Sequence, residues 1–139
     1  MAFCLWVGYI ETGGGKKKDR EMKLTQPVPE LPVSDVQSAQ CYYRDRFGFK
    51  IEWLYPGGEI GAVSNGTCAI FFRRTEGPIH PGVFWIFAED VDAAYQDLKD
   101  RGADIVDHLE DKPWGMRQFT IRDMNGNKFY VHHDLPTQA

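Results

Sequence analysis

The chain has 139 residues, of which 42% are hydrophobic, 26% charged and 14% aromatic, a balance typical of a soluble globular domain. It contains no apolar run of the 18 or so residues that a membrane helix needs. Its net charge of −4 argues against nucleic-acid binding, which usually requires a basic patch. Cys4, Cys41 and Cys68 lack the paired spacing of a zinc or disulfide framework, which predicts free thiols in the cytoplasm.

The N-terminal segment has an unusual composition. Residues 1–10 are apolar, and residues 13–18 read Gly-Gly-Gly-Lys-Lys-Lys. Because the basic cluster follows the apolar run, the segment does not have the pattern of a secretory signal. Alternation within the apolar run permits an extra N-terminal strand, and the glycine-lysine stretch is typical of a flexible linker. We therefore expect residues 1–21 to be a tail without a catalytic role or, alternatively, an arm that stabilises a dimer.

The first half of the remaining chain predicts one helix and four strands. Ser34 or Asp35 can cap the start of the helix, and Gly48 can end it. Alternating apolar residues predict the strands, and Asn65-Gly66 predicts a hairpin turn. The predicted elements are a strand at 28–33, a helix at 34–48 and strands at 49–55, 59–64 and 67–73.

The second half repeats this order of elements. Residues 34–48 resemble residues 89–102 at an offset of 55 residues, so that Asp35 matches Asp90. The predicted elements are a strand at 83–88, a helix at 89–102, strands at 103–108, 116–122 and 127–133, and a loop at 110–115. Because a βαβββ half of about 55 residues buries little core alone, we expect one α+β domain with a first module at 22–78 and a second at 79–139.

Several motifs within this repeat resemble a known family. They are residues 32–36, 42–49, 89–93, 112–117 (Lys-Pro-Trp-Gly-Met-Arg) and 123–127 (Asp-Met-Asn-Gly-Asn). Over residues 24–135 the chain resembles the vicinal oxygen chelate superfamily, which includes glyoxalase I and extradiol dioxygenases, and it is most similar to the bleomycin-resistance branch. The resemblance implies two βαβββ modules in a cupped mixed sheet, and a homodimer with its cleft at the subunit interface.

Enzymes of this superfamily hold a divalent metal on the strand before each helix and on the last strand of each module. The resemblance places these positions at Val28, Ile70 or Phe71, Val83 and Tyr130. None of these side chains offers the carboxylate or imidazole group that divalent metals prefer. We therefore expect no metal cofactor, and the sequence favours a protein that is not an enzyme.

A metal site in a shifted register is the alternative. Glu30 and His132 each lie two residues from a family ligand position, and His80 lies three residues before another. These three residues would support a metal-dependent lyase, isomerase or dioxygenase. The sequence carries no Gly-x-Ser-x-Gly motif, P-loop or Gly-x-Gly-x-x-Gly motif that would indicate other chemistry.

Aromatic residues at or near the family's ligand positions predict a binding cleft. Such side chains suit flat, amphipathic or cationic molecules. The ligand-binding candidates are Trp85, Tyr130, Phe72, Trp114, His132 and Trp53. A place in the core is the alternative for Phe72 and Trp53, and anchoring of its own loop is the alternative for Trp114.

The sequence thus predicts a metal-independent protein that sequesters a small aromatic or cationic molecule, with no catalytic residues, and the resemblance implies that this protein is a homodimer. The resemblance implies a role in antibiotic resistance, and we expect no nucleic-acid or membrane partner. A further alternative is an orphan dimer that acts in protein interaction.

Overall fold

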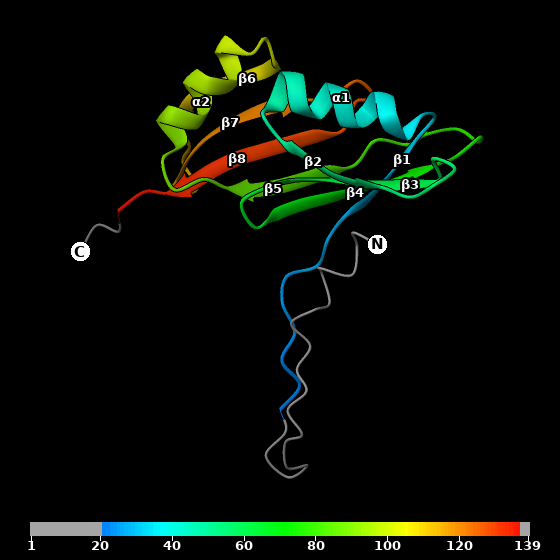
Figure 1. The fold of residues 1–139 in the computed structure, drawn as a ribbon. Coiled ribbons are helices and arrows are strands. Elements are labelled where there is room, and N and C mark those ends of the chain that lie inside the picture. The colour runs from blue at the N-terminus through cyan, green and yellow to red at the C-terminus, as the bar shows by residue number, and fades with distance from the viewer. Residues whose placement is uncertain (1–20, 137–139) are drawn as a thin grey trace.

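The computed structural model describes residues 21–136. Two sheets lie on one side of the molecule and two helices cover them on the other (Figure 1). The elements of the first module are β1 (Glu30–Val33), α1 (Val36–Phe47), β2 (Lys50–Leu54), β3 (Ile60–Asn65) and β4 (Cys68–Arg74). The elements of the second are β5 (Val83–Phe87), α2 (Val91–Asp100), β6 (Asp104–Asp111), β7 (Met116–Arg122) and β8 (Lys128–Asp134).

Each module forms a four-stranded mixed sheet. The strand orders are β1-β4-β3-β2 and β5-β8-β7-β6. In each sheet the first strand runs parallel to the last, and the other pairs are antiparallel. The predicted α+β fold with two βαβββ modules is therefore confirmed. The possible strand within residues 1–10 lies outside the described residues.

Both helices begin at an aspartate. The Asp35 carboxylate accepts a hydrogen bond from the Ser38 amide at 2.9 Å, and the Asp90 carboxylate accepts one from the Ala93 amide at 3.0 Å. Of the two predicted caps for α1, Asp35 therefore fills the position. Gly48 ends α1 with a φ of 75°, a conformation that side chains other than glycine disfavour. No helix within residues 21–136 is long and apolar enough to cross a membrane.

The structure differs from the prediction in β6, which continues to Asp111 where a loop was expected from residue 110. Glu110 and Asp111 pair in register with β7, although the ladder is irregular there. Their charges are compensated, because Lys112 contacts Glu110 at 2.6 Å and Arg117 contacts Asp111 at 2.9 Å. These ion pairs offset the repulsion between the neighbouring carboxylates and so allow both acidic residues in this edge strand.

One hydrophobic core joins the two modules. Tyr43 on α1 is fully buried, and its ring packs against Phe72 of its own module and Phe129 of the other. Its hydroxyl donates a 2.6 Å hydrogen bond to the Asp123 carboxylate in the turn between β7 and β8. The two modules are thus held together by packing and by a buried hydrogen bond.

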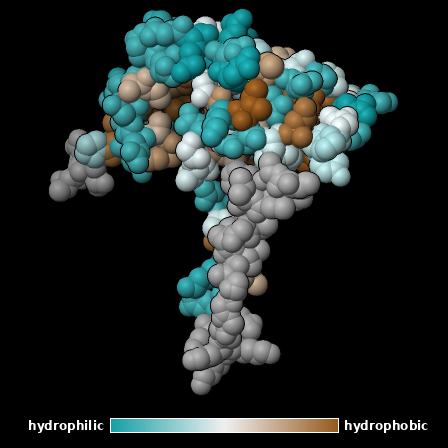
Figure 2. All heavy atoms as spheres, in the orientation of Figure 1, coloured by the Kyte–Doolittle hydropathy of each residue, from teal (hydrophilic) through white to brown (hydrophobic). Residues whose placement is uncertain are grey.

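The face seen in Figure 2 is hydrophilic over the helices, with apolar side chains between the helices and the sheets.

Candidate functional site

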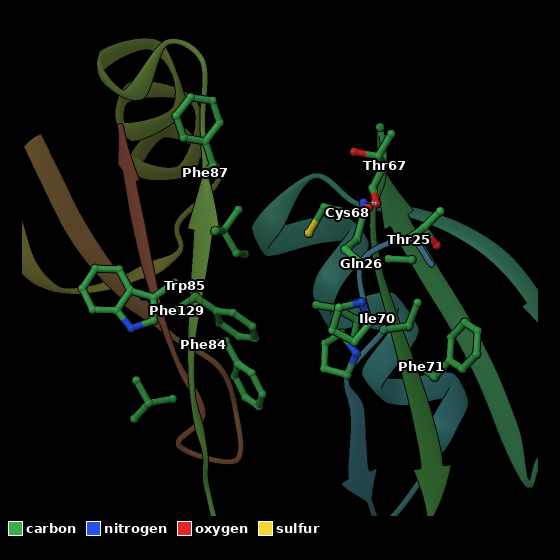
Figure 3. Close-up of a pocket in the computed structure, with 17 residues that line it drawn as sticks. Thr25, Gln26, Thr67, Cys68, Ile70, Phe71, Phe84, Trp85, Phe87 and Phe129 are labelled. Carbon is green, nitrogen blue, oxygen red and sulfur yellow. Dashed lines mark hydrogen bonds between the residues drawn. The ribbon is translucent and has the colours of Figure 1, made fainter. Parts of the chain in front are cut away.

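A groove of about 1320 Å³ lies where an edge of one sheet faces an edge of the other (Figure 3). Residues 25–29, which lead into β1, and residues 66–71 around the start of β4 form one wall. β5 forms the other wall along its whole length, with Phe129 of β8 behind it. β1 and β5 are edge strands in their sheets, and the groove follows the edge of β5 on one side and the segment that leads into β1 on the other.

β5 exposes an unusual amount of apolar surface. Its sequence is Val-Phe-Trp-Ile-Phe, in which alternate residues point to opposite faces. Phe84 and Ile86 pack against the core, whereas Val83, Trp85 and Phe87 keep 52%, 52% and 60% of their surface exposed. Large apolar side chains gathered in the open usually mark a binding site.

Two residues of β8 extend this patch. Tyr130 and His132 lie on the same face, and their ring centres are 4.7 Å and 5.4 Å from that of Trp85. The ring of Phe87 lies 6.0 Å from that of His132. We call Trp85, Phe87, Tyr130 and His132 the aromatic surface. The sequence prediction included three of these residues and missed Phe87, which could have been found from its spacing of two residues from Trp85.

His132 is held in its neutral form within the aromatic surface. Its Nδ1 atom is buried and accepts or donates no hydrogen bond among the described residues. Burial lowers the pKa of the imidazole, because charging the ring would place a second N–H in surroundings with little polar contact. The surface therefore carries little positive charge at neutral pH.

The first module contributes Phe71 to the opposite wall of the groove. Trp53 packs against Phe71 with ring centres 5.2 Å apart, although Trp53 does not line the groove itself. Phe72 is fully buried in the core, where its ring lies 4.9 Å from that of Tyr43. Its predicted place in the binding cleft is wrong, because its side chain is enclosed by core residues and does not line the groove. The core alternative holds for this residue.

Trp114 lies apart from the groove wall, in the loop between β6 and β7. Its side chain is 57% exposed, and its indole Nε1 donates a 2.9 Å hydrogen bond to the Gln118 side chain. Gln118 stands opposite His132 in the β7–β8 ladder, so Trp114 is linked to the edge of the aromatic surface. Lys112 holds the same loop through contacts with Asp107 and Glu110.

Arg117 belongs to a surface network that ties α2 to β6. Its guanidinium contacts the carboxylates of Asp92 at 2.8 Å and Asp111 at 2.9 Å. Both carboxylates raise the pKa of Arg117, so it is permanently charged. Its side chain is engaged within the protein and does not line the groove.

The residues at the family's ligand positions do not fit a divalent metal. Val28, Phe71 and Val83 line the groove, and Tyr130 packs on Trp85. Within residues 21–136, no group of three or more histidine, cysteine, aspartate or glutamate side chains is placed to hold a metal ion.

The alternative site made of Glu30, His80 and His132 is therefore not assembled. The Glu30 carboxylate contacts the Arg73 guanidinium at 2.9 Å, and His132 packs between aromatic rings. Each of these two side chains is engaged by neighbours that cannot ligate a metal.

Comparisons with known proteins place this architecture in a family. Residues 25–131 match the sequence family described as the Glyoxalase/Bleomycin resistance protein/Dioxygenase superfamily. Among curated proteins no sequence match is found.

Solved structures share the fold. TioX from Micromonospora sp. ML1 is 27% identical, with a TM-score of 0.70 over 80% of this chain and 100% of TioX. A glyoxalase-related enzyme from Clostridium phytofermentans is 17% identical, with a TM-score of 0.69 over 84% of this chain and 99% of that one. The bleomycin-binding protein from Streptomyces verticillus, solved with copper(II)-bleomycin, is 22% identical, with a TM-score of 0.64 over 84% and 100% of the two chains.

Proposed function

The chain belongs to the glyoxalase/bleomycin resistance protein/dioxygenase superfamily, and we propose that it binds and sequesters a small aromatic or cationic molecule without using a metal ion or changing that molecule chemically. The observation that carries this proposal is the aromatic surface beside the groove. One of its members, Tyr130, stands at a position where the resemblance places a metal ligand in enzymes of this superfamily.

The chemistry of the surface suits binding. Trp85 presents half of its side chain to solvent, and Tyr130 and His132 hold the indole in place by edge contacts. A flat ligand stacked on such a ring gains burial of apolar area together with ring–ring interaction. Among the described residues that line the groove, no histidine, carboxylate or amine is present to act as a general base. Retention of the intact ligand is therefore the simplest function of the site.

We propose that the working form is a homodimer in which a second copy completes the cleft. An exposed apolar stripe on an edge strand, made of Val83, Trp85 and Phe87, supports this proposal. In sedimentation velocity experiments, wild-type protein should sediment as a dimer. A monomer at all accessible concentrations would contradict the dimer without affecting ligand binding by a single chain.

In the cell, sequestration of a toxic compound would confer resistance to it. We propose that this takes place in the cytoplasm, and the free thiols of Cys41 and Cys68 are consistent with a reducing compartment. Expression in a susceptible host should raise the tolerated concentration of the bound compound.

Quenching of tryptophan fluorescence tests the binding function. A panel that contains acridine and bleomycin would be titrated into wild-type protein and into Trp85→Ala. Loss of the stacking ring should weaken binding by about 1–2 kcal/mol, or roughly 5- to 30-fold. Tyr55→Ala is the matched control, because Tyr55 is an exposed aromatic residue that does not line the groove. Equal binding by Trp85→Ala and wild type would contradict the proposed site, and no binding by any compound would favour a protein-interaction role.

A further inference from the structure

Among the residues that the structure describes, no charged side chain lines the groove beside the aromatic surface. Seventeen residues line it, and no aspartate, glutamate, lysine, arginine or histidine occurs among those that the structure describes there. Figure 3 shows Phe84 and Phe129 between β5 and the strand that bears Ile70 and Phe71, with Trp85 on the other side of β5. The walls are therefore apolar over most of their length.

Hydrogen-bonding groups gather at one end of the groove. Thr25, Gln26 and Thr67 lie close together there (Figure 3), and the Gln26 side-chain amide donates a 3.4 Å hydrogen bond to the Thr67 carbonyl. These groups can exchange hydrogen bonds with a polar atom of a ligand, but they offer no full charge. The groove thus combines an apolar body with one uncharged polar end.

Charges on the flanking strands do not favour a cation either. Glu30 is the acidic residue nearest in the chain to the first wall, and its carboxylate is held by Arg73 at 2.9 Å. Lys128 stands opposite Val83 in the β5–β8 ladder and contributes a positive charge. A cation that enters the groove therefore meets a compensated carboxylate on one side and a like charge on the other.

Desolvation decides between an uncharged and a cationic ligand. An aromatic ring attracts a cation by about 0.5–2 kcal/mol. Removal of a charge from water costs several kcal/mol unless an opposite charge compensates it. The ring attraction alone does not repay that cost, whereas an uncharged aromatic molecule gains from burial and pays no comparable penalty.

We propose that the groove selects flat, uncharged aromatic molecules over cationic ones of the same shape. This inference rests on the proposed binding function and narrows its ligand class. The ring system lies against Phe84 and Phe71, and a neutral hydrogen-bonding group of the ligand meets the Gln26 end of the groove.

Two probes with the same ring plane test the selection. Acridine is uncharged in mildly alkaline buffer, and N-methylacridinium carries a permanent positive charge on the same three rings. Isothermal titration calorimetry on the full chain should give an affinity for acridine at least about tenfold higher. Gln26→Glu adds a carboxylate with little change of shape and should strengthen binding of the cation by at least about fourfold, because opposite charges roughly 5 Å apart attract by that amount even at the dielectric constant of bulk water.

Gln96→Glu is the matched control. Gln96 is exposed on α2, outside the groove, so this variant has the same net charge as Gln26→Glu without a carboxylate at the site. The inference is supported if the ratio of the affinity for acridine to that for N-methylacridinium is smaller in Gln26→Glu than in wild type and is unchanged in Gln96→Glu. Equal or tighter binding of N-methylacridinium by wild type overturns it and leaves the binding function standing. Absence of binding by both probes overturns the binding function and this inference together.

Discussion

The hydrogen bond from Tyr43 to Asp123 makes the stability of the two modules interdependent. Tyr43→Phe removes only the hydroxyl, so the aromatic packing of α1 on both sheets is kept. The Asp123 carboxylate is 5% exposed and retains three donors, the amides of Asn125 and Asn127 and the Asn127 side chain. A single hydrogen bond to a charged group contributes about 1.5–3 kcal/mol. For a domain of this size, that loss should lower Tm by roughly 5–15 °C.

Thermal unfolding monitored by circular dichroism and by tryptophan fluorescence checks this value. The fluorescence signal includes Trp53 of the first module and Trp85 and Trp114 of the second. Both signals should fall together in Tyr43→Phe, because the bond joins the modules. Tyr95→Phe is the matched control, because the hydrogen bond of the Tyr95 hydroxyl, 3.4 Å from His108, is exposed. Loss of this hydroxyl should lower the free energy of unfolding by less than about 0.5 kcal/mol. Equal stability of the two variants, or separate transitions for the two modules, would refute the reasoning.

Three further predictions follow from other parts of the structure. Gly61→Ala would place a Cβ 2.8 Å from the Gln40 side-chain nitrogen and should lower the free energy of unfolding, measured in urea, by about 1–3 kcal/mol. Gly77→Ala is the control, because its Cβ would meet nothing within 4 Å, and it should lower the free energy of unfolding by less than about 0.5 kcal/mol. Because burial lowers the pKa of His132, the unfolded chain takes up a proton at a higher pH than the native protein, and stability should fall as pH decreases below about 6.5. His132→Gln should flatten that part of the pH profile of the free energy of unfolding, whereas the wild-type protein should show the full slope. Excess EDTA or added Zn²⁺ should leave Tm unchanged, and a clear rise with metal would contradict the metal-independent account.

The fold could be predicted largely from the sequence because local signals agreed with one another. Asp35 and Asp90 supply helix caps in both halves, and the Asn65-Gly66 turn fixes one hairpin. The internal repeat then added information about how the segments assemble. The extension of β6 to Asp111 could not be predicted, because it depends on ion pairs with Lys112 and Arg117 that form only after folding.

The candidate site was predicted in part. The resemblance placed ligand positions at Val83 and Tyr130, and spacing of two residues from them identified Trp85 and His132. The structure brings Trp85, Tyr130 and His132 together. The same argument failed for Phe72, because the face of β4 that points to the core is set by its register with β1 and β3. Residues 25–27 were also missed as part of a groove wall, since only the tertiary structure places this segment opposite β5.

The most direct test of metal-independent binding at the aromatic surface is a nuclear magnetic resonance titration with acridine in excess EDTA. The indole N–H signal of Trp85, assigned with Trp85→Phe, and the backbone amides of β5 should shift in a saturable way. The signals of backbone amides on the outer face of α2 should not shift. Shifts that require an added divalent metal, or that leave Trp85 and β5 unchanged, would contradict the account.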